Sequence, residues 1–448
     1  MSVLARLFAV GFACLQAASV VIAASHEEAP VQVLIRNVAI WDGTSDAAVG
    51  GQAVLIENNL IKRISADASA GPDATVIDGG GRVLMPGIIE AHTHLSLPLP
   101  ISRVINSEDW MYIATLAGKE AGRILMRGWT TVRDIGGPTQ GLAKAIDEGH
   151  AIGPRIYTSA MFISQTSGHG DFRALNDGHP NMGGSRNNWG QRYALLADGP
   201  AEVSRAVRES LRHGATAIKV MAGGGISSEY DPIDTTQYSV EELRAAVEAA
   251  EQWNTYVAVH AYTDAAVRNA LEAGVKVIEH GHLLSEDTLR LLKQKGAILS
   301  TQTFSFAKTF MGRMPSETSA KARIVLEGVD NLMRTAKKLD IQVAFGTDAF
   351  GSSRAFEGAV KEFGARLEWF TSLEILKQAT SGNARLLALT GPRNPYQQGP
   401  LGVIEEGAYA DLLIVDGDPL EDVRILEDYE NNIRLIMKDG VVYKNTLN

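Results

Sequence analysis

Two histidines separated by a single residue are the first sign of chemistry in this sequence. His92 and His94 close the segment Met85 to His94, in which Ile88 and Ile89 are typical of a buried strand. Side chains two residues apart on a strand project to the same side, so both imidazoles would leave the strand end together. Such a pair is a common metal ligand set, but it also occurs as ordinary buried histidines. The pair by itself leaves both roles open.

Four further polar residues lie at the ends of separate apolar runs: Lys219, His260, His280 and Asp348. Runs of this kind are typical of strands that are buried on both faces of a parallel sheet. Any one of the four could be a buried histidine, an ion-paired lysine or a helix-capping aspartate. Their shared position, together with that of the histidine pair, favours one site built from five strand ends.

The elements that would position these residues form an alternating pattern in the middle of the chain. Short apolar runs alternate with amphipathic segments, which predicts an α/β fold with a parallel sheet covered by helices. Eight strands are predicted, at Val83 to Ala91, Thr130 to Ile135, Arg155 to Ser159, Ala217 to Ala222, Tyr256 to Ala261, Lys276 to Glu279, Ala297 to Thr301 and Gln342 to Thr347. Helices are predicted at Val240 to Trp253 and Ala265 to Ala273, with Ser239 and Asp264 as N-caps. Eight such units predict a (β/α)8 TIM barrel, whose active site forms at the carboxyl ends of the strands. A doubly wound open sheet is the alternative.

Both ends of the chain are rich in short β-like runs with turn residues between them. These runs cover residues 31–41, 53–64, 410–415 and 433–443. We therefore expect a small β-sandwich domain formed from both chain ends, residues 25–82 and 396–448. The barrel domain, residues 83–395, would be inserted between its two parts.

The first residues and the cysteine count indicate an exported protein. After Arg6, the apolar stretch Leu7 to Ala24 ends in small residues, which predicts a secretory signal peptide over residues 1–24 rather than a buried helix or a membrane anchor. The mature protein would be periplasmic or secreted. Cys14 is the only cysteine and lies in this stretch, which excludes disulfides, thiolate metal ligands and a cysteine nucleophile from the mature chain. No other apolar run reaches the roughly 20 residues of a membrane helix.

Composition and missing motifs exclude several function classes. The chain is 45% hydrophobic and 21% charged, with a formal net charge of -10 and no Lys/Arg-rich run. That balance is typical of a globular protein and argues against nucleic acid as a partner. The triplet Gly223-Gly224-Gly225 lacks the Gly-Lys-Ser/Thr that completes a phosphate loop. A Gly-x-Ser-x-Gly nucleophile elbow is absent from the sequence.

Together these segments resemble the amidohydrolase superfamily over nearly the whole mature length. Within it, the chain looks most similar to bacterial zinc dipeptidases and carboxypeptidases of the Xaa-Pro and Xaa-Arg/Lys type, and to ochratoxin-degrading amidohydrolases. The segments that carry the resemblance are Met85 to His94, Ile218 to Ser227, Val257 to His260, Ile278 to Gly281, Gly346 to Asp348 and Ala379 to Ala384. The superfamily often has aspartate where this chain has Glu90, a position that is not expected to be a ligand.

The resemblance implies a site for two divalent metal ions, with zinc expected. An ammonium group cannot ligate a cation, so Lys219 would be carboxylated to N6-carboxylysine, whose two oxygens would bridge the ions. A metal-bridging hydroxide would attack an amide carbonyl, and Asp348 would move the proton to the leaving amine. The remaining ligands would be His92 and His94 with Asp348 for one ion, and His260 and His280 for the other.

His169 and Tyr230 are the predicted substrate-binding residues. They lie in loops that follow the third and fourth predicted strands and would open onto the metal face. In the peptidases that this chain resembles, histidine and tyrosine at similar positions bind the terminal carboxylate of the substrate. The expected reaction is hydrolysis of amide bonds in small peptides or N-acyl amino acids, in the manner of a dipeptidase, a carboxypeptidase or an ochratoxin-type amidase.

Several alternatives stay open at this point. His282 lies two residues after His280 and could be the ligand in its place. A mononuclear deaminase or a cyclic amide hydrolase of the same superfamily is the second candidate enzyme, and Lys219 distinguishes it, because one ion needs no carbamate bridge. An exported protein that only sequesters metal or solute is a third candidate, against which Asp348 argues as a proton shuttle. Nothing in the sequence identifies the native metal or decides whether the chain forms a homo-oligomer.

Overall fold

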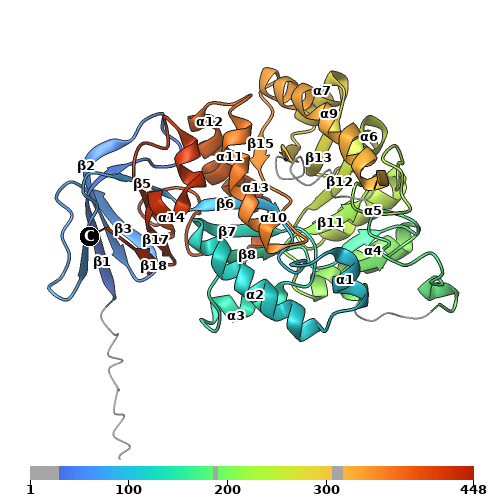
Figure 1. The fold of residues 1–448 in the computed structure, drawn as a ribbon, viewed down its shortest axis with the longest axis horizontal. Coiled ribbons are helices and arrows are strands. Elements are labelled where there is room, and N and C mark those ends of the chain that lie inside the picture. The colour runs from blue at the N-terminus through green and yellow to red at the C-terminus, as the bar shows by residue number, and fades with distance from the viewer. Residues whose placement is uncertain (1–29, 185–189, 305–315, 448) are drawn as a thin grey trace, which may run out of the picture.

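The computed structural model describes residues 30–184, 190–304 and 316–447 (Figure 1). The predicted signal peptide, residues 1–24, lies outside this range. Figure 1 shows strands from both ends of the chain side by side at the left, and parallel strands surrounded by helices at the right. Within the described residues, no helix has the length and apolar character that a membrane span requires.

One sheet is built from both ends of the chain. Its main strand order is β18-β17-β16-β5-β1-β2-β3, and β4 pairs with β1. The strands are β1 (Gln32–Ile40), β2 (Val49–Glu57), β3 (Leu60–Ser65), β4 (Thr75–Asp78), β5 (Val83–Pro86), β16 (Leu412–Val415), β17 (Ile433–Lys438) and β18 (Val441–Asn445). β5 joins the two halves, since it is parallel to β1 and antiparallel to β16. The terminal runs therefore form strands of a shared sheet, as the sequence indicated, whereas a sandwich architecture stays a prediction.

The middle of the chain forms two sheets in which every strand pair is parallel. The first contains β6 (Ile88–Thr93), β7 (Trp129–Asp134) and β8 (Arg155–Thr158). The second has the order β10-β9-β11-β12-β13-β14-β15, with β9 (Phe162–Ser164), β10 (Ala194–Leu196), β11 (Ile218–Met221), β12 (Val257–Thr263), β13 (Val277–Leu283), β14 (Ile298–Thr301) and β15 (Val343–Phe345). The predicted α/β class with parallel strands is confirmed.

The first predicted strand, Val83 to Ala91, is divided at Gly87. Residues before it belong to β5 in the terminal sheet, and residues after it belong to β6 in a parallel sheet. The backbone N–H of Gly87 donates to the carbonyl of Asp411 at 2.8 Å, and a Cβ at Gly87 would lie 2.1 Å from the hydroxyl oxygen of Thr130. The continuous apolar run did not reveal this change of partner, because both strands are buried on both faces.

Helices follow most of the parallel strands. The α-helices in the described residues are α1 (Ile101–Asn106), α2 (Trp110–Met126), α3 (Gln140–Asp147), α4 (Pro200–Arg212), α5 (Val240–Glu251), α6 (Asp264–Ala273), α7 (Glu286–Gln294), α9 (Ser316–Lys338), α10 (Ser353–Gly358), α11 (Glu362–Arg366), α12 (Ser372–Lys377), α13 (Asn383–Leu387) and, in the terminal domain, α14 (Tyr429–Asn432). Ser239 caps α5 as predicted, in a capping box with Glu242. The predicted cap Asp264 is instead the first residue of α6, whose N-cap position is Thr263.

A buried arginine connects the two parallel sheets. Arg133 on β7 donates to the carbonyl of Ala91 at 2.6 Å and to Glu279 on β13 at 2.5 Å. Its guanidinium also lies 3.4 Å from the hydroxyl of Ser300 on β14. All of these residues are at most 1% exposed. The interior of the parallel strands therefore contains a polar network as well as apolar side chains.

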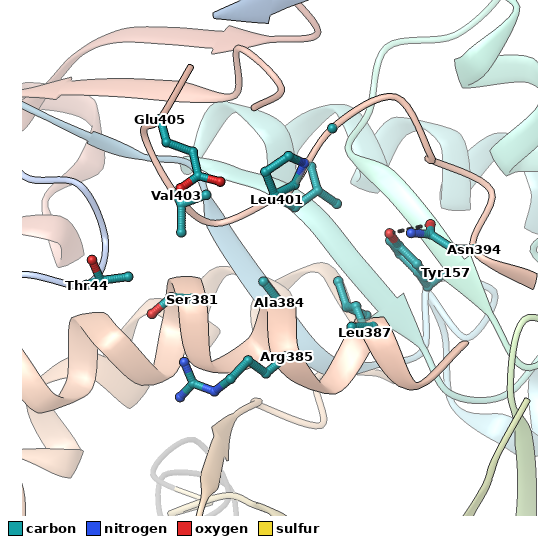
Figure 2. A pocket seen from close by; sticks show the side chains of 13 residues that line it. Thr44, Tyr157, Ser381, Ala384, Arg385, Leu387, Asn394, Leu401, Val403 and Glu405 are labelled. Atoms are coloured by element: carbon teal, nitrogen blue, oxygen red, sulfur yellow. Dashed lines mark hydrogen bonds between the residues drawn. The ribbon is translucent and has the colours of Figure 1, made fainter. Parts of the chain in front are cut away.

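A small cavity of about 330 Å³ lies between α13 and the segment of residues 399–405 (Figure 2). Tyr157 and Asn394 line it and share a hydrogen bond of 2.8 Å. Its walls include the aliphatic side chains of Leu387, Leu401 and Val403. None of the predicted site residues lines this cavity, so it is separate from the candidate site.

Candidate active site

A larger cavity, of about 730 Å³, brings together every residue that the sequence singled out for the site. Its lining includes His92, His94, Lys219, His260, His280, Asp348, His169 and Tyr230. They come from β6, β11, β12, β13 and the loops that follow these and neighbouring strands. The carboxyl ends of the parallel strands thus meet at a common opening.

Three of these side chains form a group that could hold a metal ion. Atoms of His92, His94 and Asp348, one from each residue, all lie within 4.8 Å of one another. The Nε2 atoms of His92 and His94 are 3.4 and 3.3 Å from Asp348 Oδ1. Burial works to raise the pKa of Asp348, but the two histidines outweigh it and hold this pKa below its ordinary value. An ionised carboxylate with two imidazoles is a donor set suited to a transition metal.

Hydrogen bonds within the chain orient both histidines of this group. Nδ1 of His92 donates to Glu279 Oε2 at 2.8 Å, and Nδ1 of His94 donates to the carbonyl of Gly136 at 3.1 Å. Each bond fixes the ring and leaves Nε2 directed at Asp348. Ligand histidines in metalloproteins are held in the same manner, by an acceptor for the second ring nitrogen.

His260 and His280 are oriented in the same way, on the neighbouring strands β12 and β13. Nε2 of His260 donates to the carbonyl of Gly224 at 3.1 Å, and Nδ1 of His280 donates to Gln302 Oε1 at 2.8 Å. Their ring centroids lie 4.5 Å apart. Burial holds the pKa of both histidines, and that of His92, well below the ordinary value, so these rings are neutral, as a ligand must be.

The backbone is in an unusual conformation at two of the predicted ligands. His280 has a φ of 74° and Asp348 a φ of 56°, in the left-handed region that non-glycine residues rarely adopt. Such residues persist where surrounding structure forces them, often at functional sites. At both residues this unusual backbone accompanies a side chain that lines the cavity.

Lys219 on β11 is 1% exposed and lines the same cavity. In the described part of the chain, its ammonium group has no hydrogen bond and no ion pair. Burial lowers the pKa of Lys219 to about 8, although Glu279 and Asp348 oppose that shift. A buried lysine without a paired carboxylate is costly as a cation, so its neutral amine is more accessible here than at an exposed lysine.

His169 and Tyr230 lie on the same cavity but differ in their surroundings. His169 stacks on His260, with ring centroids 4.1 Å apart, and its Nδ1 lies 2.6 Å from the hydroxyl of Ser228 and 3.3 Å from Asp231. Tyr230 is 40% exposed, so it stands at the rim. The His169 ring is thus held in place beside the predicted ligand His260, whereas Tyr230 faces solvent as well as the cavity.

Comparison with known proteins finds both related sequences and related structures. Residues 83–443 match the amidohydrolase family, and ochratoxinase of Aspergillus niger is 31% identical over 448 aligned residues, covering 94% of this chain and 88% of that protein. The chain belongs to the amidohydrolase family. A prolidase crystallised with N-methylphosphonate-L-proline has a TM-score of 0.86 at 32% identity, covering 93% of this chain and 100% of that one. A Xaa-Pro dipeptidase with methionine in its active site has a TM-score of 0.80 at 28% identity, covering 92% and 100%.

In this amidohydrolase, sequence reasoning missed the residues that hold the ligands in place. Glu279 binds both His92 and Arg133, and Gln302 binds His280. The signal that could have found them is a polar residue inside or directly after an apolar strand run. Glu279 directly precedes His280, and Gln302 directly follows β14.

Glu90 and His282, each two residues from a predicted ligand, support the site and do not face the predicted metals. Glu90 accepts the backbone N–H groups of His92 and Thr347, both at 2.9 Å, and burial raises its pKa to about 8. His282, the alternative to His280, does not line the cavity, and its Nε2 donates to the carbonyl of Gln302 at 2.8 Å. The geometry therefore favours His280 as the residue that faces the predicted metals.

Proposed function

We propose that this amidohydrolase hydrolyses amide bonds in small peptides or N-acyl amino acids that have a free carboxylate. One observation carries the proposal: the rings of His92, His94, His260 and His280 are each held by a hydrogen bond at one nitrogen. The other nitrogen of each ring is available in a cavity that also contains Lys219 and Asp348. The names of the similar proteins, ochratoxinase and Xaa-Pro dipeptidase, agree with amide hydrolysis.

This donor set fits two divalent cations. His92, His94 and Asp348 would hold one, and His260 and His280 the other, with zinc expected for imidazole ligands. When bound, two such ions supply the activation of water and the polarisation of the amide carbonyl.

Lys219 would join the two halves of the ligand set as N6-carboxylysine. Its neutral amine would form a bond to the carbon of carbon dioxide and release one proton, giving a carbamate with two oxygens. The lowered pKa and the absence of an ion pair among the described residues support this step. A mononuclear deaminase would need no such bridge, so Lys219 favours the amide hydrolase over that alternative.

Asp348 would hold and move the proton of the reaction. Its carboxylate lies within 3.4 Å of His92 and His94, and its ionised form is stabilised there. A carboxylate in this position can take a proton from water and deliver it to the leaving amine. His169 and Tyr230 would bind the substrate carboxylate, because an imidazole and a phenol can both donate hydrogen bonds to an anion.

We also propose that the two parallel sheets close into one (β/α)8 barrel. The backbone N–H of Asp348, after β15, donates to the carbonyl of His92 on β6 at 2.7 Å, and that of Thr216, before β11, donates to Thr158 on β8 at 2.7 Å. These contacts connect the seven-stranded sheet to both edge strands of the three-stranded sheet, β6 and β8. The sandwich form of the terminal sheet, and export after removal of residues 1–24, complete the proposal. Amino-terminal sequencing of the mature protein tests the export.

The decisive test compares a free acid with its amide. The purified, metal-loaded protein is assayed with a dipeptide and with the same dipeptide amidated at its C-terminus. Amidation is expected to lower kcat/KM by roughly 10- to 150-fold, the value of a charge-assisted hydrogen bond. Turnover should disappear with a chelator and return with zinc. Equal rates for the acid and the amide would exclude the proposed carboxylate site.

Metal content tests the bridge independently of turnover. Lys219→Ala should lower the content well below two ions per chain, whereas Lys144→Ala, at an exposed lysine of α3, should leave it unchanged. A Lys219→Ala protein that retains two ions would refute the carbamate. Partial recovery of activity in this variant with added short carboxylic acids would support it.

A further inference from the structure

A buried carboxylate at the carboxyl end of β7 has no part in the proposed function so far. Asp134 is the last residue of β7, which lies between β6 and β8, and it is 0% exposed. It does not line the large cavity, so it does not face the predicted metals. A buried carboxylate is costly unless its oxygens accept hydrogen bonds, so its partners show what it holds in place.

The hydrogen bonds of Asp134 lie on both sides of the His94 ring. Oδ2 of Asp134 accepts the backbone N–H of Leu95, the residue directly after His94, at 2.7 Å. Oδ1 accepts the backbone N–H of Gly136 at 3.4 Å, and the carbonyl of Gly136 accepts from Nδ1 of His94 at 3.1 Å. One carboxylate therefore connects the main chain that carries the His94 ring with the residue that accepts from this ring.

We propose that Asp134 is a positioning residue for His94. The proposal rests on the role of His94 as a metal ligand in the proposed function, and it names the group that holds this ligand in place. By fixing Leu95 relative to Gly136, Asp134 keeps Nε2 of His94 directed at Asp348, whose Oδ1 lies 3.3 Å away. A ring that is held before the metal binds loses less side-chain entropy on binding.

The acceptor of His94 depends on such support because it is a glycine carbonyl. Gly136 and Gly137 have φ values of 154° and 121°, which glycine adopts without strain. A Cβ at Gly136 would lie 1.8 Å from the ring of Phe162, and a Cβ at Gly137 would lie 1.9 Å from the hydroxyl oxygen of Ser96. The two glycines let the loop pass close to its neighbours, but they have no side chains that could anchor it.

The preceding residue of β7 supports the other histidine of the pair. Arg133 donates to Glu279 at 2.5 Å, and Glu279 accepts from Nδ1 of His92 at 2.8 Å. Successive side chains of a strand project to opposite faces, so Arg133 and Asp134 leave β7 on opposite sides. Two adjacent residues of one strand thus hold the acceptors of the two ligand histidines, one each.

The test is a double-mutant cycle on zinc affinity, measured by competition with a chromophoric chelator. The four proteins are the wild type, Asp134→Asn, His94→Ala and the double variant. Asparagine keeps one acceptor oxygen but turns an NH₂ group towards the second backbone N–H. The backbone N–H groups of Ile135 and Gly137 keep their acceptors at 3.1 and 2.7 Å, so part of the loop stays in place.

The cycle separates positioning from general stability. Mutation of a residue that orients a ligand histidine costs about 10- to 100-fold in metal affinity, and we expect a loss of about tenfold for Asp134→Asn. In the His94→Ala background the same change should cost less than about twofold, because two residues that act through one another are not additive. Equal losses in both backgrounds would overturn the proposal.

A second measurement needs no metal and decides the case if the His94→Ala protein binds too little zinc. In the metal-free wild type, the Nδ1 proton of His94 should give a downfield resonance in proton NMR, because it donates to the Gly136 carbonyl. Its absence from His94→Ala assigns it. In Asp134→Asn this proton should exchange with water several-fold faster, and unchanged exchange would contradict the positioning role.

Asp42→Asn is the matched control for both measurements. Asp42 also accepts two backbone N–H groups just after a strand, those of Thr44 and Ser45, both at 2.7 Å, but it lies in the terminal part of the fold. This variant should leave the zinc affinity and the His94 proton unchanged. If the metal-loaded protein hydrolyses neither dipeptides nor N-acyl amino acids, the proposed function fails, and these two measurements still decide the role of Asp134. If hydrolysis is found but the cycle is additive, only the role of Asp134 is refuted.

Discussion

Glu279→Gln isolates the buried carboxylate that connects the candidate metal site to the interior of the fold. Glu279 is fully buried, accepts from His92 at 2.8 Å, and accepts from Arg133 at 2.5 Å. Glutamine keeps the size and shape of the side chain while removing its charge. The variant therefore separates the effect of the charge from that of packing.

The expected loss of unfolding free energy in this variant depends on the contacts that Arg133 keeps. Burial works against its charge, but Glu279 outweighs this and raises the pKa of Arg133 above its ordinary value. Removing one partner of a buried ion pair typically costs about 3–5 kcal/mol of unfolding free energy. Arg133 would keep the carbonyl of Ala91 at 2.6 Å and the weaker contact with Ser300 at 3.4 Å. We therefore expect a loss near the lower value, about 3 kcal/mol.

Metal affinity should fall in the same variant, because glutamine has a single neutral acceptor oxygen where Glu279 accepts from both His92 and Arg133, so the His92 ring is held less firmly. Mutation of the residue that orients a ligand histidine typically costs 10- to 100-fold in metal affinity. Urea unfolding measures the stability of the metal-free protein, and competition with a chromophoric chelator measures the affinity. Glu148→Gln, at an exposed pair with Lys144, is the control and should change stability by less than about 1 kcal/mol. If Glu279→Gln matches wild type in both measurements, the network has no role in holding the site.

Three further predictions concern other parts of the site. Asp348→Asn should retain most of the metal but lose turnover by several orders of magnitude, as measured by metal analysis and kcat, because the proton carrier is gone. The Lys321 ammonium donates to the carbonyls of Ser228 and Asp231 at 2.9 and 3.0 Å, and these two bonds hold the loop that carries Tyr230. Lys321→Met should therefore raise KM more than it lowers kcat. A variant with the KM of the wild type would contradict this role. Gly225→Ala should weaken the preference for the free acid over the amide, because its Cβ would lie 1.9 Å from the His169 ring. Gly141→Ala is the control, since a Cβ at this position of α3 meets no atom within 4 Å, and it should leave that preference unchanged.

The sequence predicted the site residues because a strand end is a local feature. His260 and Asp348 follow apolar runs that are long enough to identify as buried strands, and parallel strands bring their carboxyl ends to the same edge. The structure places both residues on one cavity with the other predicted ligands. Boundaries were predicted less well, as at Gly87, because a strand that is buried on both faces has no alternation to mark where its partner changes.

The supporting residues could not be predicted in the same way, since their roles depend on distances across the interior. Glu279 and His92 are 187 residues apart, and Arg133 and Glu279 are 146 residues apart. No local pattern indicates which of several buried polar residues will meet. Gln302 similarly gains its role only because β14 pairs with β13, which places it near His280.

The hydrogen-bond pattern of the four rings would also favour the proposed metal binding. A histidine that must reorient on binding loses side-chain entropy, and a charged histidine must first lose a proton. Here the acceptors Glu279, Gly136, Gly224 and Gln302 already hold the rings. Burial keeps three of those rings neutral. Folding therefore orients these rings and keeps them neutral before a metal binds. Removal of an acceptor should thus lower both the stability of the parallel-strand interior and the affinity for metal.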